Sequence, residues 1–245
     1  MTNRAPDDKE KYVHQVFDTI APGYDRMNML MTFGMWKYWQ TVFRRLMAVE
    51  PGQEILDVGC GTADLSIIAA RALAGEAGHV TGIDLSQEML DVGRIKLHRL
   101  GLADRITLLQ GNALALPFAD QRFHLVISGF MLRNVSDVQR ALQEMTRVVR
   151  PGGRVVVMEL THPENRIIAA PYLLYFRHVV PWLGRWANGE GKLPPYAWLP
   201  ESLREIPPAP VLMRMMERAG LTDVSYRSLT GGIVAIHQGR KTSDG

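Results

Sequence analysis

The chain has 245 residues, of which 47% are hydrophobic and 22% charged, a composition that fits one α/β domain with a sizeable core. A net charge of +3 without any run of Lys and Arg argues against a nucleic-acid partner. The single cysteine excludes internal disulfides and a thiolate metal cluster, and the seven histidines show no metal-ligand spacing. A charged N-terminus and the lack of a long uncharged run argue against a signal peptide and a membrane span, so we expect a cytoplasmic protein without a bound metal.

The N-terminal residues 1–48 are expected to form a helical preface to a single domain that spans residues 1–245. The second half of this preface is strongly apolar and aromatic, from residues 33–39 on to Phe43, Leu46 and Met47. This segment does not show the strand and helix alternation of the rest of the chain.

Residues 54–64 form the most informative stretch, a short buried strand, a tight turn with two glycines and the start of a helix. Gly59 and Gly61 let a ligand approach the backbone, and the helix N-terminus offers unpaired N–H groups. The third glycine of the dinucleotide fingerprint G-x-G-x-x-G is replaced by Asp64. A carboxylate there repels a pyrophosphate but tolerates a cationic cofactor, as does Asp57. The turn therefore favours S-adenosylmethionine over a nicotinamide dinucleotide.

Residues 79–84 form the next predicted strand, which ends in an acid 25 residues after Gly59. At this place Asp84 can accept hydrogen bonds from both hydroxyls of a ribose. The alternative is that Asp84 only caps the following helix or turn. Ser86 competes for that capping role just before the apolar face of the helix begins, which leaves Asp84 available to a ligand.

The remaining elements alternate between strand and helix, the pattern of a parallel sheet covered on both faces. We predict helices over residues 87–100, 137–149 and 209–219, and strands over 105–110, 123–128, 154–160, 224–229 and 233–238. Residues 151–153 should end the second of these helices, and residues 230–232 should form a hairpin turn. The expected fold class is α/β, the Rossmann-like class I methyltransferase plan with a mostly parallel sheet, helices on both faces and a C-terminal antiparallel hairpin.

Residues 163–206 form an apolar insertion before the last helix. Two prolines in its apolar part, together with Arg177 and His178, argue against a membrane-spanning helix. We expect this insertion to form a lid over the substrate. The alternative is a purely structural cover for the core.

Longer motifs, in order along residues 11–241, resemble those of the ubiquinone/menaquinone biosynthesis C-methyltransferase family. Residues 16–28 resemble the pattern VFDxIAxxYDxMN, and residues 229–237 resemble LTGGIVALH. Further matches lie at residues 56–64, 111–118, 132–135 and 147–153. The glycine turn and Leu-Pro-Phe are shared by many methyltransferases, whereas YDxMN, LRNV and GGIVAxH are much more specific to the quinone enzymes.

The resemblance implies transfer of a methyl group from S-adenosylmethionine to a ring carbon of a prenylated quinol, a demethylmenaquinol or an ubiquinol precursor. Because such an acceptor is dissolved in the bilayer, we expect transient contact of the enzyme with the membrane surface. A homodimer is a further expectation. The amide of Asn112 suits an adenine edge, since it offers both a donor and an acceptor. The positions assigned to the cofactor are Asp57, Gly59, Gly61, Thr62, Asp84, Leu85, Asn112, Ala113 and Gly129.

Methylation of an aromatic carbon needs an electron-rich ring, which ionisation of a quinol hydroxyl supplies. We expect the permanently charged Arg133 to stabilise the phenolate, and Tyr24 and Asn134 to hold the ring or a water. The alternative for Arg133 is a salt bridge to Asp137 at the start of the next helix. His237 titrates in the range of a general base, but on a terminal strand we expect it to be structural.

Two departures from the family pattern leave the acceptor open. Met131 replaces a glycine and adds bulk near the expected substrate entrance, and the lid sequence differs as well. One alternative is a methyltransferase that acts on another apolar small molecule, and another is a non-catalytic subunit of a quinone-synthesis complex. Retention of the cofactor acids and of Arg133 and Asn134 argues against the second alternative.

Overall fold

A computed structural model describes residues 6–73, 77–163, 174–175, 179 and 206–243. Within these residues seven strands form one sheet in the order β3-β2-β1-β4-β5-β7-β6, and only β7 runs antiparallel to its neighbours. The mostly parallel sheet with a C-terminal antiparallel pair confirms the predicted fold class. The strands are β1 (Glu54–Val58), β2 (His79–Asp84), β3 (Ile106–Gln110), β4 (Phe123–Gly129), β5 (Val149–Leu160), β6 (Leu221–Leu229) and β7 (Val234–Lys241).

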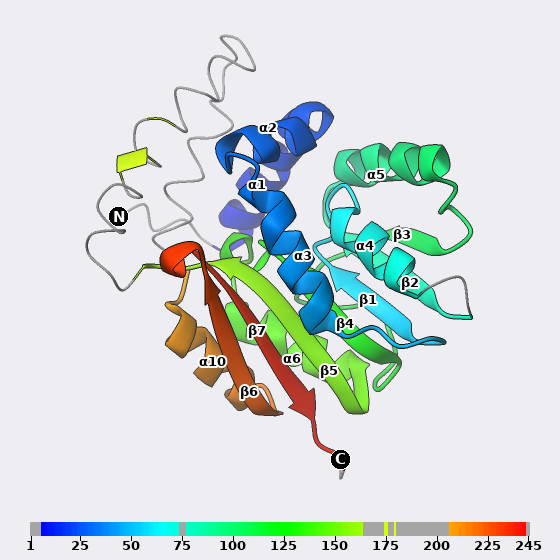
Figure 1. Cartoon of the computed structure of the whole chain (residues 1–245), viewed down its shortest axis with the longest axis vertical. Coiled ribbons are helices and arrows are strands. Elements are labelled where there is room, and N and C mark those ends of the chain that lie inside the picture. Colours follow the sequence, from blue (N-terminus) through cyan, green and yellow to red (C-terminus); the bar gives the residue numbers. More distant parts are fainter. Residues whose placement is uncertain (1–5, 74–76, 164–173, 176–178, 180–205, 244–245) are drawn as a thin grey trace.

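Helices cover both faces of the sheet (Figure 1). One face packs against α3 (Met35–Met47), α4 (Asp64–Ala72) and α5 (Gln87–Leu100), and the other against α6 (Val138–Val148) and α10 (Ala209–Arg218). Neighbouring residues of a central strand point to opposite faces, so Ile55 of β1 joins the first apolar cluster and Leu56 joins the second. This double burial explains why the central strands are almost continuously apolar.

Two helices, α1 (Pro6–Ile20) and α2 (Tyr24–Met31), precede α3, and a short 3₁₀ turn (Ala21–Gly23) joins them. They form a third apolar cluster, in which Val16, Ile20 and Met27 pack with Met89 of α5. In Figure 1 they lie at the top of the molecule, above the sheet and beside α5. The N-terminal helices are therefore docked on the domain by apolar contacts.

Capping residues mark the start and end of α5 and the start of α6, and Ser86 takes the predicted role. The Oγ of Ser86 accepts a hydrogen bond from the backbone N–H of Met89 at 3.2 Å, and Gly101 ends α5 in the left-handed conformation. Asp137 caps α6 by accepting from the N–H of Arg140 at 2.9 Å. Local capping chemistry thus determined these boundaries.

The prediction for residues 151–153 was wrong, because β5 begins at Val149 and runs through them. The residue pairs Phe123–Val149 and Leu125–Arg154 show that β5 holds extra residues opposite β4. Gly152 has a φ of +73°, and a Cβ on Gly153 would lie 2.8 Å from the carbonyl oxygen of His124. The glycines therefore form an irregularity inside the strand instead of a turn before it.

Nearly all of the expected lid, residues 163–206, lies outside the described residues. The exceptions are residues 163, 174, 175, 179 and 206. None of the helices that the structure describes has the length and apolar character needed to cross a membrane.

Candidate active site

The turn between β1 and α4 requires glycine at its first position. Gly59 has a φ of +71°, and a Cβ there would lie 2.3 Å from the Cγ of Met131. The N–H groups of Gly59 and Cys60 both donate to the carbonyl of Ile83, at 2.8 and 3.1 Å. The turn is thereby held against the end of β2, where Asp84 follows.

Asp84 is anchored by two backbone donors. Its Oδ2 accepts from the N–H of Gly61 at 2.8 Å and its Oδ1 accepts from the N–H of Ser86 at 3.0 Å. Burial raises the pKa of Asp84, although these backbone hydrogen bonds act to lower it. Each carboxylate oxygen has lone pairs beyond these bonds, so a fixed Asp84 can still accept from a ligand.

A first cavity of about 100 Å³ lies where β1, β2 and β4 end, and α1 covers it. It is lined by most of the predicted cofactor residues and by two of the three predicted catalytic residues: Gly59, Gly61, Asp84, Leu85, Asn112, Ala113, Gly129, Tyr24 and Asn134. Val13, His14 and Phe17 of α1 also line this cavity. Sequence reasoning missed these three residues, and only Phe17 lies within the motif at residues 16–28 that could have signalled it.

A second and larger cavity, of about 490 Å³, has a mainly apolar wall. Most of its aromatic residues come from the N-terminal segment and from the loop after β4, and the ring centroids of Trp36 and Phe130 lie 5.5 Å apart. Trp39, Phe33 and Tyr175 complete this aromatic wall. The sequence showed an apolar preface but did not show that it encloses a cavity.

The two cavities are neighbours and share part of their walls. The shared residues are Tyr24, Gly59, Gly61, Gly129 and Phe130. Burial raises the pKa of Tyr24, so its hydroxyl stays neutral at physiological pH and can donate a hydrogen bond. Ligands in the two cavities would therefore meet at Tyr24.

Asp57 lines the second cavity and not the first, unlike Asp84 and Asn112. The hydroxyl of Ser66 donates to its Oδ2 at 2.6 Å, but its Oδ1 has no hydrogen-bond partner among the described residues. Burial raises the pKa of Asp57 to about 7. A buried carboxylate oxygen without a donor marks a place where a ligand can supply one.

Arg133 also lines the second cavity, and its Nη1 donates to Glu159 at 2.7 Å. Both side chains are buried. The alternative of a salt bridge to Asp137 is wrong, because Asp137 caps α6 and the charge partner of Arg133 is Glu159 on β5. The Nε of Arg133 has no partner in the described part of the chain.

Thr62 lies in the second cavity, where its hydroxyl donates to Asp25 at 2.6 Å. Lys96 donates to Asp25 at 2.6 Å and to Asp64 at 2.5 Å. The charge of Asp64, which we expected to face a cationic cofactor, is thus already paired with a lysine. This cluster joins α2 and α5 to the glycine turn.

Two further expectations concern Met131 and His237. Met131 lies in the wall of the first cavity, against Gly59, whereas we expected its bulk near the substrate entrance. His237 is buried and its Nε2 lies 2.9 Å from the carbonyl oxygen of Ala209. Burial lowers the pKa of His237 to about 4. His237 is not one of the described residues that line the two cavities.

The sequence places this arrangement in a family. The profile of the ubiE/COQ5 methyltransferase family matches residues 5–241. A demethylmenaquinone methyltransferase of Bacillus velezensis is 45% identical over 233 residues, which cover 95% of this chain and 98% of the relative. This chain belongs to the ubiE/COQ5 methyltransferase family. It is an S-adenosylmethionine-dependent methyltransferase, and the predicted family, reaction type and cofactor are confirmed.

Solved structures agree with the fold of this ubiE/COQ5 family member. An S-adenosylmethionine-dependent methyltransferase from Aquifex aeolicus has a TM-score of 0.59 at 19% identity, covering 82% of this chain and 88% of its own. The [4+2]-cyclase SpnF has a TM-score of 0.70 at 19% identity, covering 95% and 97%. At this identity the likeness shows the fold alone, since one fold hosts different reactions.

Proposed function

We propose that this methyltransferase methylates a ring carbon of a prenylated quinol, with demethylmenaquinol as the acceptor. The relative from Bacillus velezensis is named for the corresponding quinone. The observation that carries the proposal is the pair of adjoining cavities, because the cavity that holds Asp84 and Asn112 and the large aromatic cavity meet at Tyr24 and Gly59. Such an arrangement suits a flat, apolar acceptor placed beside a nucleoside cofactor.

The residues of the first cavity and of the shared wall fit S-adenosylmethionine. Asp84 would accept from the ribose hydroxyls, and Asn112 and Ala113 would hold the adenine. The unpartnered Oδ1 of Asp57 would accept from the cationic end of the cofactor. When bound, S-adenosylmethionine supplies an electrophilic methyl group.

The acceptor ring would lie in the second cavity against Trp36, Trp39 and Phe130. Arg133 would lower the energy of the phenolate that forms when a quinol hydroxyl loses its proton, and its Nε is a donor without a partner among the described residues. Tyr24, which lines both cavities, would hold the ring or a water by a hydrogen bond. Asn134 lines only the first cavity, so it would hold a water on the cofactor side of the ring. Once the methyl group has been added, the proton on the methylated carbon leaves and the ring becomes aromatic again.

An exposed apolar surface near the second cavity would bring the enzyme to the cytoplasmic face of the membrane. Phe33 is 76% exposed and Leu174 is 61% exposed, and the ring of Phe33 lies 5.4 Å from that of Tyr175 in the cavity wall. A prenyl tail could leave the cavity along these side chains. Three basic residues of the insertion that would suit anionic headgroups, Arg177, Arg185 and Lys192, lie outside the described residues.

A methyl-transfer assay tests the proposal, with demethylmenaquinol and a demethoxy-type ubiquinol precursor offered side by side as reduced substrates. We expect faster methylation of demethylmenaquinol. An enzyme that binds S-adenosylhomocysteine but methylates neither quinol would refute the proposed acceptor. Preference for the benzoid substrate would change the assignment to ubiquinol synthesis.

A further inference from the structure

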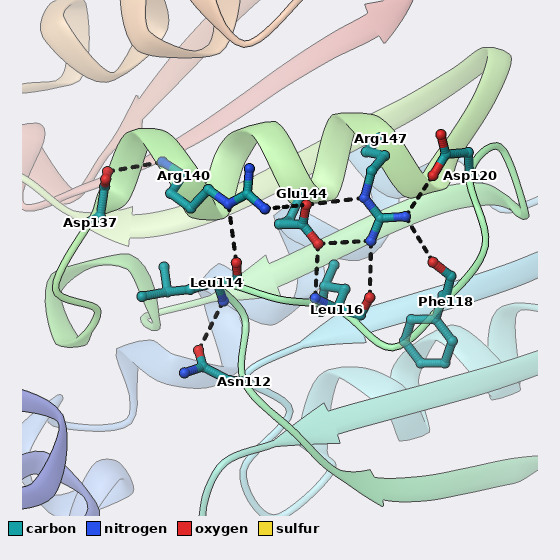
Figure 2. A network of polar contacts seen from close by, with 9 residues as sticks. All are labelled: Asn112, Leu114, Leu116, Phe118, Asp120, Asp137, Arg140, Glu144 and Arg147. Atoms are coloured by element: carbon teal, nitrogen blue, oxygen red, sulfur yellow. Dashed lines mark hydrogen bonds and ion pairs between the residues drawn. The ribbon is translucent and has the colours of Figure 1, made fainter. Parts of the chain in front are cut away.

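Helix α6 holds the loop between β3 and β4, residues 111–122. No residue of α6 is among the described residues that line the two cavities. Figure 2 shows this helix running alongside the loop, with its polar side chains directed at the loop backbone. The start of the loop, at Asn112 and Ala113, is part of the first cavity. The contacts therefore connect a helix on the far face of the sheet to the expected adenine site.

Glu144 is the centre of this network, and its side chain is buried. Its Oε2 accepts from the N–H of Leu116 at 2.8 Å and from Arg147 at 2.7 Å (Figure 2). Its Oε1 accepts from the Nε of Arg147 at 3.0 Å and lies 3.2 Å from the guanidinium of Arg140. The hydrogen bonds with Arg147 hold the pKa of Glu144 below its usual value, so Glu144 is ionised at neutral pH.

Arg147 binds the backbone carbonyl groups of the same loop. Its Nη2 donates to the carbonyl of Leu116 at 2.9 Å, and its Nη1 donates to the carbonyl of Phe118 at 2.8 Å and to Asp120 at 2.7 Å. Leu116 is thus held at both its N–H and its C=O. This is a tighter restraint than a surface ion pair provides, because the acceptors are fixed backbone groups.

The restraint continues toward the cavity through Leu114 and Asn112. Arg140 donates through Nε to the carbonyl of Leu114 at 3.2 Å, and the N–H of Leu114 donates to the Oδ1 of Asn112 at 2.9 Å. The last bond directs the amide of Asn112, whose residue lines the first cavity. An unbroken series of contacts therefore joins Glu144 and Arg147 to Asn112.

We propose that Glu144 and Arg147 are positioning residues that hold Asn112 and Ala113 where the adenine of S-adenosylmethionine is recognised. Neither residue lines the first or the second cavity, so neither would contact the cofactor. The inference rests on the proposed cofactor role of Asn112 and Ala113, and it is independent of which quinol is the acceptor.

The test measures binding of two products to the full-length enzyme by titration calorimetry. One is S-adenosylhomocysteine, and the other is S-inosylhomocysteine, in which a carbonyl oxygen replaces the 6-amino group of adenine. We expect the wild type to prefer the adenosyl compound by about tenfold or more, since one buried hydrogen bond accounts for such a factor. Arg147→Met should weaken adenosyl binding about tenfold and bring the ratio of the two dissociation constants close to one. General destabilisation would weaken both ligands equally and leave that ratio unchanged.

Arg154→Met is the matched control. Arg154 also binds backbone carbonyl groups, those of Leu46, Met47 and Ala48 at the end of α3, but none of these residues lines either cavity. It should keep the wild-type ratio. Glu144→Gln is a second test variant, because it preserves the shape of the side chain. If Arg147→Met does not fold, a ratio of the two dissociation constants reduced about threefold in Glu144→Gln supports the inference.

An unchanged ratio in a folded Arg147→Met or Glu144→Gln variant overturns the inference, and so does a wild type that does not discriminate. A wrong assignment of the acceptor would give a different result. In that case neither prenylated quinol is methylated while the wild type still binds S-adenosylhomocysteine with the expected preference.

Discussion

The guanidinium of Arg133 and the carboxylate of Glu159 form a buried ion pair, with Nη1 and Oε1 2.7 Å apart. Burial raises the pKa of Glu159, and the neighbouring Arg133 acts to lower it. The pair joins the 3₁₀ turn η2 (Leu132–Asn134) to β5. Because one face of Arg133 is engaged by Glu159, its orientation in the cavity wall is fixed.

We predict that Arg133→Met lowers methyl-transfer turnover about 100-fold or more, because it removes the charge that stabilises the phenolate. The same change leaves Glu159 buried without its partner and should lower the free energy of unfolding by about 3 kcal/mol. Turnover under saturating substrates and urea unfolding measure the two effects. Cofactor affinity should change little.

The double variant Arg133→Met/Glu159→Gln separates the two roles of Arg133. Removing the unpaired carboxylate should restore much of the stability without restoring turnover. Asp137→Ala is a control for the neighbouring helix start, where loss of the cap costs about 1 kcal/mol of stability and leaves turnover unchanged. Wild-type turnover in Arg133→Met would show that the pair is purely structural.

A second prediction concerns Asp84. Asp84→Ala removes a charged acceptor for the ribose hydroxyls and should weaken S-adenosylmethionine binding about ten- to a hundredfold. Asp84→Asn keeps one acceptor oxygen, which can serve the N–H of Gly61 or that of Ser86 but not both, and should therefore lose less stability than the alanine variant, which keeps none. Calorimetric titration of both variants tests this, with Asp91→Asn, an exposed acid on the following helix α5, as the control. Unchanged affinity of Asp84→Ala for S-adenosylmethionine would show that other residues bind the ribose.

A third prediction concerns pH. With a pKa of about 7, Asp57 is largely protonated below neutral pH and ionised above it. A cationic ligand favours the ionised form, so S-adenosylmethionine affinity should rise as the pH increases from about 6 to 8 and then level off. Binding below pH 7 should release a proton, which titrations in buffers of different ionisation enthalpy detect.

Asp57→Asn should remove this pH dependence. Burial is the main cause of the raised pKa of Asp57, and the charges of Asp84 and Asp64 add to it. If the slope persists in Asp57→Asn, it comes from another titrating group, and Asp57 does not receive the cationic end of the cofactor.

The sequence predicted those parts of the fold that depend on local patterns. The helix at residues 87–100 and the glycine turn follow from capping and backbone conformation, which neighbouring residues determine. The partners of Arg133 and Asp64 were not predictable in this way. Glu159 lies 26 residues after Arg133 and Lys96 lies 32 residues after Asp64, and only packing brings them together.

The aromatic cavity was missed for the same reason. An apolar run such as residues 33–39 predicts burial, but it does not show whether its partner is core or ligand. The enclosure of the second cavity depends on contacts between α3 and the loop after β4, for example between Trp39 and Phe130. Long-range packing of this kind has no signature in a single sequence.

The last prediction concerns the exposed apolar surface beside the second cavity. Leu174→Asp should raise the Michaelis constant for a long-tailed quinol about fivefold or more, because each methylene of the tail gains about 0.8 kcal/mol from burial. Leu174 is 61% exposed, so a charged residue there should not unfold the protein. Binding of S-adenosylmethionine should stay unchanged. A short-tailed analogue should be much less sensitive, because it has little tail to bury.

Ile95→Asp provides the matched control, since Ile95 is 54% exposed on α5 and lines neither cavity. It should leave both Michaelis constants at their wild-type values. Flotation with anionic vesicles should show weaker association for Leu174→Asp than for Ile95→Asp, because only the first removes apolar area beside the cavity. If Leu174→Asp affects the long-tailed and the short-tailed quinol equally, residue 174 acts on the ring site and the surface does not guide the tail. Equal vesicle binding by the two variants would show that this surface does not contact the membrane.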